Sequence, residues 1–147
     1  MNFQPREFTR GNYVVSTDPW RLNLAWVHSY LTHESYWARG ISEQVFYKSV
    51  ENSLCFGVYD QVGQVGFGRV ISDFATFAYL ADVFVAQKVQ GQGLGKWLVQ
   101  CMLAYPELQG LRRWMLATRD AHGLYEQFGF KPVETPGNLM EIMKVVG

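Results

Sequence analysis

Apolar and polar residues alternate along several short runs of the chain, and this spacing of two predicts β-strands. Such runs, or short continuous apolar ones, lie at residues 12–17, 54–59, 64–71, 79–86 and 114–118. Two later apolar runs, at 130–133 and 140–145, predict strands that complete the sheet. The sequence Asp-Gln-Val-Gly at 60–63 is typical of a hairpin turn between two of these strands.

Apolar residues recur every three or four positions in four other segments, which predicts helices. The first starts at Asp18 and Pro19, an N-cap residue followed by proline, and the second spans 42–51. A third covers 94–105, where Pro106 ends it, and a last one surrounds 121–128. The predicted buried positions are Trp20, Leu24, Val27 and Leu31 in the first helix, Leu94, Trp97, Leu98, Cys101 and Met102 in the third, and Ala121, Leu124, Tyr125 and Phe128 in the last.

This order of elements predicts a mixed α/β (α+β) fold. With 147 residues, the chain has the usual size of one domain, which we expect to span 1–147. Its 13 basic and 13 acidic residues cancel, so we expect no binding to nucleic acid or to an anionic membrane. The expected partner is therefore a small molecule or a local protein segment.

Neither a membrane-spanning run nor the apolar stretch of a signal peptide is visible, so we expect a cytoplasmic protein. Cys55 and Cys101 lie in apolar patterns, which favours buried free thiols over a disulfide or a nucleophile. The histidines have no cysteine or carboxylate cluster at ligand spacing, so no metal site is expected.

The most informative segment reads Gln-Lys-Val-Gln-Gly-Gln-Gly-Leu-Gly-Lys at 87–96, between a predicted strand and a predicted helix. Glycines at every second position expose backbone N–H groups, and the helix start adds a positive dipole end, so the segment predicts a phosphate site. A P-loop is excluded because Gln90 stands for its first glycine and Trp97 for its Ser or Thr. A dinucleotide fingerprint is excluded because Lys96 stands for its third glycine.

Residues 90–95, Gln-Gly-Gln-Gly-Leu-Gly, resemble the (Gln/Arg)-x-x-Gly-x-(Gly/Ala) signature of the GNAT acetyltransferase superfamily. Residues 123–130 resemble its later Leu-Tyr-Glu-x-x-Gly-Phe signature, and 80–85 resemble its fourth strand. The resemblance implies a mixed, mostly antiparallel sheet flanked by helices, and acetyl-coenzyme A as the cofactor. Taken alone, each motif is also compatible with a plain glycine turn or with core aromatics around a helix end at Gly129.

The resemblance also implies which residues contact the cofactor. The pyrophosphate would lie on the loop, and the pantetheine arm would pair with the backbone of Phe84 and Val85, one of which would point an N–H at the thioester oxygen. Thr118 stands where many members carry an asparagine that bonds the pantetheine. The expected cofactor-binding residues are Phe84, Val85, Gln90, Gly91, Gln92, Gly93, Leu94, Gly95, Lys96, Thr118 and Tyr125.

Two residues are predicted to be catalytic. Tyr125 matches the family's tyrosine and would protonate the leaving thiolate; the alternative is a core tyrosine whose hydroxyl has a backbone partner. Asp82 interrupts an apolar strand and would accept the proton of the incoming ammonium; the alternative is a buried acceptor that holds a loop. Asp73, Asp120, a histidine or a chain of waters are other candidates for the base.

The acceptor is expected to be a primary amine of a small molecule or a peptide. Tyr36, Trp37, Asp73, Phe77 and Tyr79 are the expected wall of its site, because aromatics beside a carboxylate suit an amine on an apolar body. Core packing is an equal alternative for several of them. At the level of the molecule, the alternatives are a non-catalytic acetyl-coenzyme A sensor and a homodimer whose function lies in its interface.

Overall fold

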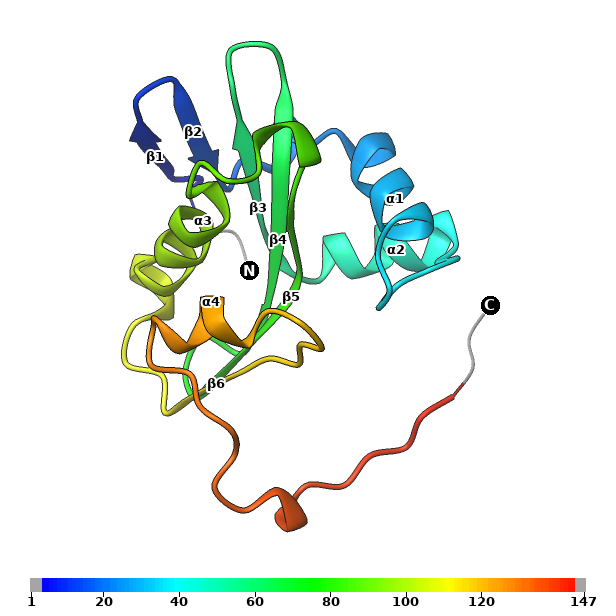
Figure 1. The fold of residues 1–147 in the computed structure, drawn as a ribbon, viewed down its shortest axis with the longest axis vertical. Coiled ribbons are helices and arrows are strands. Elements are labelled where there is room, and N and C mark those ends of the chain that lie inside the picture. Colours follow the sequence, from blue (N-terminus) through cyan, green and yellow to red (C-terminus); the bar gives the residue numbers. More distant parts are fainter. Residues whose placement is uncertain (1–3, 145–147) are drawn as a thin grey trace.

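A computed structural model describes residues 4–144, and a six-stranded sheet forms their centre (Figure 1). The order of the strands in the sheet follows the chain. Neighbouring strands are antiparallel except for the last pair, which is parallel, so the mixed, mostly antiparallel sheet is confirmed. The strands are β1 (Glu7–Arg10), β2 (Tyr13–Ser16), β3 (Leu54–Tyr59), β4 (Gln64–Ser72), β5 (Phe77–Val85) and β6 (Arg113–Met115).

Helices cover both faces of the sheet (Figure 1). On one face lie α1 (Leu24–His33) and α2 (Glu43–Glu51), and on the other lie α3 (Leu94–Leu103) and α4 (His122–Glu126). Successive side chains of a strand point to opposite faces, so each face has its own core. Phe67 and Phe84 pack with α1 and α2, whereas Phe56 belongs to the cluster around α3.

The predicted first helix begins later than expected. The Asp18 side chain accepts from the Trp20 backbone N–H and starts only a single 3-10 turn, Pro19–Arg21. Asn23 caps α1 by accepting from the Trp26 N–H, so the helix starts at Leu24. Trp20 therefore lies on the surface and not on the buried face. None of the helices within residues 4–144 is both long and apolar enough to cross a bilayer.

A β-bulge interrupts β5 near its end. Phe67 lies opposite Phe84 and Arg69 opposite Ala81, which leaves Asp82 and Val83 facing Gly68 alone. Asp82 takes a positive φ of 56°, a backbone conformation that aspartate tolerates better than most residues. A bulge changes the direction of side chains and leaves backbone groups without ladder partners, so this part of β5 can offer backbone groups to a ligand.

The predictions for the C-terminal strands were wrong. Residues 130–133 and 140–144 form no strand, and every residue from Lys131 to Lys144 is exposed; residue 145 lies outside the described part. This C-terminal arm, residues 131–144, leads away from α4 and ends near α1 and α2 (Figure 1). The sheet thus has β6 as its last strand, and the outer edge of β6 has no partner within residues 4–144.

Candidate functional site

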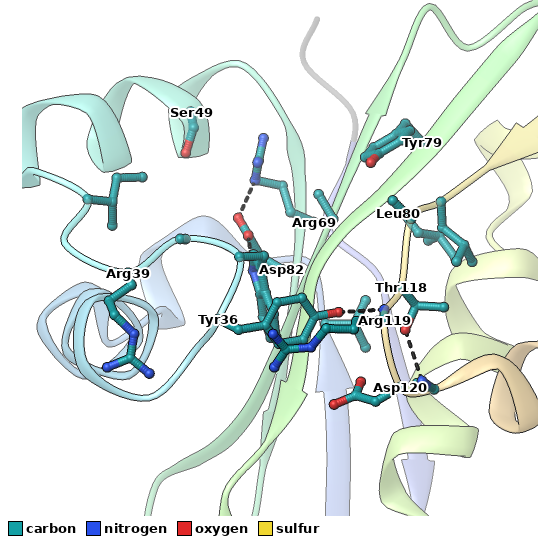
Figure 2. A pocket seen from close by; sticks show the side chains of 18 of the residues that line it. Tyr36, Arg39, Ser49, Arg69, Tyr79, Leu80, Asp82, Thr118, Arg119 and Asp120 are labelled. Atoms are coloured by element: carbon teal, nitrogen blue, oxygen red, sulfur yellow. Dashed lines mark hydrogen bonds and ion pairs between the residues drawn. The ribbon is translucent and has the colours of Figure 1, made fainter. Parts of the chain in front are cut away.

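A cleft opens where the parallel strands β5 and β6 separate. Phe77–Tyr79 pairs with Arg113–Met115, and beyond this point the two segments diverge. A cavity of about 850 Å³ occupies the opening and extends under the connection between α1 and α2 (Figure 2). Its walls include Leu80, Ala81, Asp82 and Val83 from β5, Leu116 to Ala121 from the segment after β6, Tyr125 from α4, and Tyr36 to Arg39.

The structure brings together most of the residues predicted for catalysis and for acceptor binding. Tyr36, Trp37 and Tyr79 line the cavity together with Asp82, Thr118, Asp120 and Tyr125. Asp73 and Phe77 do not line it, because they lie at the turn between β4 and β5. The Asp73 carboxylate accepts from the hydroxyl and backbone N–H of Thr76 and from neighbouring N–H groups, which hold its pKa well below the usual range. Asp73 therefore stabilises this turn.

Both carboxylate oxygens of Asp82 have partners. Oδ2 accepts from Arg69 Nε at 2.9 Å, and Oδ1 accepts from Trp37 Nε1 at 2.8 Å. The ion pair is largely buried, with 14% of the Arg69 side chain and 9% of the Asp82 side chain exposed. Arg69 also donates to the Ser53 hydroxyl. Because both oxygens already accept hydrogen bonds from protein side chains, these contacts favour the role of buried acceptor over that of base.

A second contact joins the α1–α2 connection to the far wall of the cleft. The Arg119 backbone N–H donates to the Tyr36 hydroxyl at 2.8 Å, and the Arg119 guanidinium lies over the Tyr36 ring at 3.9 Å (Figure 2). The Tyr36 ring also meets Trp37 edge-on. The two aromatic residues therefore fix the connection to both walls of the cleft, through Asp82 on one side and Arg119 on the other.

Tyr125 is buried, with 8% of the residue exposed, yet its hydroxyl has no hydrogen-bond partner within residues 4–144. Its oxygen reaches the cavity; among the described side chains, only the Tyr59 hydroxyl is sealed from solvent without a partner. Burial, with the nearby Tyr36, raises the pKa of Tyr125 to about 12. The hydroxyl thus stays protonated at neutral pH and is free to donate a hydrogen bond into the cleft, unlike a core tyrosine bonded to the backbone.

The raised pKa changes the role expected for this tyrosine. A free thiol has a pKa of about 8.5, well below the pKa of about 12 for Tyr125, so full proton transfer from Tyr125 to a thiolate is unfavourable. A hydrogen bond to the departing sulfur has no such cost. The raised pKa therefore favours a hydrogen-bond donor over a proton donor at this position.

Thr118, and not the nearby Asp120, supports the start of α4. The Thr118 hydroxyl oxygen accepts from the Ala121 N–H at 3.0 Å, whereas Asp120, a candidate for the base, makes no capping bond to the helix. The Thr118 hydroxyl hydrogen stays available to donate into the cavity.

The glycine segment forms a loop and the first turn of α3 at the end of β5. Gly91 and Gly93 have φ values of +84° and +78°, which only glycine adopts without strain. A Cβ built at Gly91 or at Gly95 would meet no atom within 4 Å, so the backbone is open on its outer side. The open backbone at a helix start fits a pyrophosphate group.

Side chains hold this loop in place from three directions. Gln90 Nε2 donates to the Val85 carbonyl, and the Tyr13 hydroxyl donates to Gln92 Oε1 at 2.9 Å. Arg10 Nη1 donates to the Gly93 carbonyl at 3.4 Å. Arg10 and Lys96 also line a smaller cavity of about 350 Å³ beside α3, which puts two cations next to the predicted phosphate site.

Phe84 and Val85 lie just beyond the cavity lining. The Phe84 ring is buried and stacks on Tyr30 at 3.7 Å, on the face of the sheet opposite α3. Any cofactor contact from Phe84 would therefore come from its backbone. The bulge residues Asp82 and Val83 are the ones that reach the cavity.

Sequence reasoning missed Arg10, Arg69 and Arg119. Each is an arginine whose partners lie far along the chain, and no local spacing marks it. The two cysteines behave as expected: both are buried free thiols, and burial raises the pKa to about 12 for Cys55 and to about 11 for Cys101.

The chain is similar to acetyltransferases in sequence and in structure. A family model described as an acetyltransferase (GNAT) domain matches residues 51–132. A candidate acetyltransferase of Gibberella zeae is 33% identical over 144 residues, which cover 83% of this chain and 80% of the relative. The crystal structure of a candidate GNAT acetyltransferase from Xanthomonas campestris is 46% identical in sequence, with a TM-score of 0.88. The match covers 90% of this chain and 93% of the Xanthomonas chain.

A more distant likeness shows the fold alone. It is a crystal structure of a candidate acetyltransferase of Clostridium acetobutylicum with acetyl-CoA, which is 10% identical with a TM-score of 0.66. The match covers 90% of this chain and 95% of that chain.

Proposed function

Because the chain belongs to the GNAT family of acetyltransferases, we propose that it transfers an acetyl group from acetyl-coenzyme A to a primary amine in the cleft between β5 and β6. One observation carries the proposal. The unpaired Tyr125 hydroxyl reaches the same cavity as the bulge of β5, and the open glycine loop follows at the end of that strand.

The residues that would hold the cofactor belong to three elements. Backbone N–H groups of Gly91 to Lys96, with the start of α3, would bind its pyrophosphate, and Lys96 and Arg10 would add positive charge nearby. The end of β5 would offer its backbone to the pantetheine arm, and the Thr118 hydroxyl would donate from the opposite wall. Acetyl-coenzyme A would supply an activated thioester.

Two groups of the protein would stabilise the charge that develops during transfer. An N–H freed by the bulge near Val83 and Phe84 would donate to the oxygen that becomes negative. The Tyr125 hydroxyl would donate to the departing sulfur. Donors that the fold holds before the cofactor binds would cost little reorganisation at the moment of reaction.

The acceptor would enter beside the aromatic side chains of Tyr36, Trp37 and Tyr79. Their ring faces attract an ammonium group, and the cavity has room for an apolar body behind it. Asp82 would keep Trp37 oriented and would neutralise Arg69, so that this largely buried cation does not repel the incoming amine. Water in the open cavity would then take the proton of the ammonium.

The deciding experiment is a screen of primary amines, small molecules and peptides, for release of free thiol from acetyl-coenzyme A. Turnover with one class of amine would support the enzyme. Binding of coenzyme A with no turnover on any amine would instead favour a non-catalytic sensor. Failure to bind coenzyme A at all would overturn both.

Substitution of Tyr125→Phe tests the role of the hydroxyl. We expect kcat and kcat/KM to fall together by roughly 10²–10³-fold, because the hydroxyl would stabilise charge only as the thiolate leaves. Coenzyme A affinity and thermal stability should stay unchanged, since the hydroxyl has no protein partner to lose. Tyr47→Phe, on an exposed part of α2, is the matched control and should change nothing. Full turnover in Tyr125→Phe would exclude this residue from the chemistry.

A further inference from the structure

The charges that line the large cavity do not balance. Arg69 and Asp82 neutralise each other in their largely buried ion pair. Of the other charged side chains that residues 4–144 contribute to the lining, three are positive and one is negative: Arg39, Arg119 and Lys144 against Asp120. The whole chain has 13 basic and 13 acidic residues, so this excess of positive charge is local to the cleft.

Arg119 is held so that its guanidinium can meet a ligand. Its backbone N–H donates to the Tyr36 hydroxyl, and its guanidinium lies over the Tyr36 ring at 3.9 Å (Figure 2). Stacking on a ring leaves the edge of a guanidinium open, and none of its N–H groups donates to an acceptor within residues 4–144. Because a side chain held in this way has little freedom left to lose, it is prepared to bind an anion through two parallel hydrogen bonds.

Two other charged residues of the lining are also without an ion pair. Arg39, on the connection between α1 and α2, donates from Nη1 to the His33 carbonyl at 3.4 Å and pairs with no described carboxylate (Figure 2). Asp120 follows Arg119 directly in the chain, but no ion pair joins the two in the described structure. The wall after β6 therefore presents a cation and an anion that are both available to a ligand.

The phosphates of the proposed cofactor do not account for these cations. The glycine loop has cations of its own, Arg10 and Lys96, which line the smaller cavity beside α3. The linings of the two cavities have no residue in common. Arg39 and Arg119 are thus left for the other substrate, the acceptor.

An amine without an anionic group is a poor match for such a cleft. It arrives as an ammonium ion, which unpaired arginines repel. An anionic group on the same molecule reverses this, because it can pair with Arg119 while the ammonium faces Asp120 and the aromatic rings. The charge pattern of the walls is therefore complementary to an acceptor that carries both charges.

We propose that the acceptor amine carries an anionic oxygen group, a carboxylate or a phosphate, which the Arg119 guanidinium binds and Arg39 helps to attract. Both groups present a pair of oxygens that the edge of a guanidinium fits. Arg119 then distinguishes an acidic amine from an amine of the same shape with an uncharged head group. The proposal rests on the proposed function and names the substrate class of the same cleft.

The test compares amines that differ only in the head group. One series has an aromatic body: para-(aminomethyl)benzoate, its carboxamide and para-(aminomethyl)phenyl phosphate. A short series consists of β-alanine, β-alaninamide and phosphoethanolamine. Thiol release gives kcat and KM, and isothermal titration of the protein with coenzyme A bound gives the Kd of each amine.

We expect the carboxylate or the phosphate of at least one series to have a KM and a Kd at least about tenfold below those of its amide. The head group with the lower values identifies the anion. Arg119→Gln removes the charge and keeps the backbone N–H that bonds Tyr36. It should raise KM and Kd of the preferred anionic amine roughly 10–100-fold with little change in kcat, and it should leave the values of the amides unchanged.

Arg112→Gln is the matched control. Arg112 is exposed and does not line the cavity, so this change should leave every value as it is. Equal affinity for the anionic amines and the amides in both series would overturn the proposal. A preference for the anionic amine that survives Arg119→Gln would overturn it too, because another group would then bind the anion.

Failure of the proposed function gives a different result. The anionic amines would then bind in a way that depends on Arg119, but no amine would release thiol. Thiol release that is as fast with the amides as with the anionic amines would support the enzyme and overturn only the assignment of its acceptor.

Discussion

The carboxylate of Asp82 binds two side chains that come from different parts of the chain, Arg69 on β4 and Trp37 on the α1–α2 connection. A residue with this pattern positions its neighbours, whereas a base would have to direct one of its remaining lone pairs at the substrate. The two roles predict different pH dependences of turnover once the Asp82 charge is removed.

We expect Asp82→Asn to lower turnover by a similar factor at every pH and to lower the free energy of unfolding by about 3 kcal/mol, since Arg69 would lose its largely buried counter-charge. Asparagine tolerates the positive φ at this position and can still accept from Trp37, so the backbone should not change. A pH–rate profile and a urea denaturation curve measure the two effects. A loss confined to low pH and rescued at high pH would instead restore Asp82 as the base.

Two tyrosines with opposite hydrogen-bond states give a matched test of stability. The Tyr59 hydroxyl is buried without a partner, whereas the Tyr105 hydroxyl bonds to Thr17 Oγ1 at 2.9 Å. Tyr59→Phe should therefore raise the free energy of unfolding by about 1 kcal/mol, and Tyr105→Phe should lower it by about 1 kcal/mol. Thermal denaturation of both variants measures the difference. If both substitutions destabilised the protein, a water or a rearranged side chain would be pairing with Tyr59.

At the scale of elements, the glycine loop and the first turn of α3 carry the predicted phosphate site. Gly95, in that first turn, is the best position at which to test this prediction. A Cβ at Gly95 would meet no protein atom within 4 Å, and φ is not positive there. Gly93 is a poorer choice because its φ of +78° would strain valine and its Cβ would face the Arg10 guanidinium.

We expect Gly95→Val to keep the thermal stability of the protein and to weaken coenzyme A binding roughly 10–100-fold, because the new side chain would occupy the space above the backbone N–H groups. Isothermal titration with coenzyme A measures the affinity. Gly63→Val, in the β3–β4 turn, has equally open surroundings and should leave the affinity unchanged. If Gly95→Val bound coenzyme A as tightly as Gly63→Val does, the glycine loop would not be part of the cofactor site.

The elements that sequence predicted well have strong local signals. The strand over 54–59 matches β3, and Ser42 caps α2 by accepting from the Val45 N–H. β1 was missed because its residues, Glu-Phe-Thr-Arg, are mostly polar and exposed at the sheet edge. The wrong start of the first helix came from a genuine local cap at Asp18 that supports only one turn.

The site was predictable only where its residues adjoin in the sequence. The glycine loop and the Tyr125 segment were found as motifs, whereas the partners of Asp82 could not be. Trp37 and Arg69 lie 45 and 13 positions from Asp82, and only the packing of α1 and the register of β4 against β5 bring them together. Asp73 was placed in the wrong environment for a different reason: its carboxylate accepts from adjacent residues of its own turn, such as Thr76, and does not line the cavity.

At the scale of the molecule, the cleft joins two parts of the chain. Residues 51–132, which match the family model, supply the loop, β5, β6 and Tyr125. The connection between α1 and α2 lies outside that match and supplies Tyr36 and Trp37. The contacts of Tyr36 with Arg119 and of Trp37 with Asp82 fix the second part to the first. Changes at 36–39 would therefore alter the proposed acceptor site and leave the proposed cofactor residues the same.

The order of the strands also determines how the site arises during synthesis. Each strand from β2 to β5 meets a partner that was made before it, and most of these pairings join adjacent segments by short turns. The parallel pairing of β5 with β6 must wait for α3 to cross over between them. A nascent chain that has not yet reached Arg113 can form five strands of the sheet but has no cleft, so the site is the last part of the sheet to be assembled.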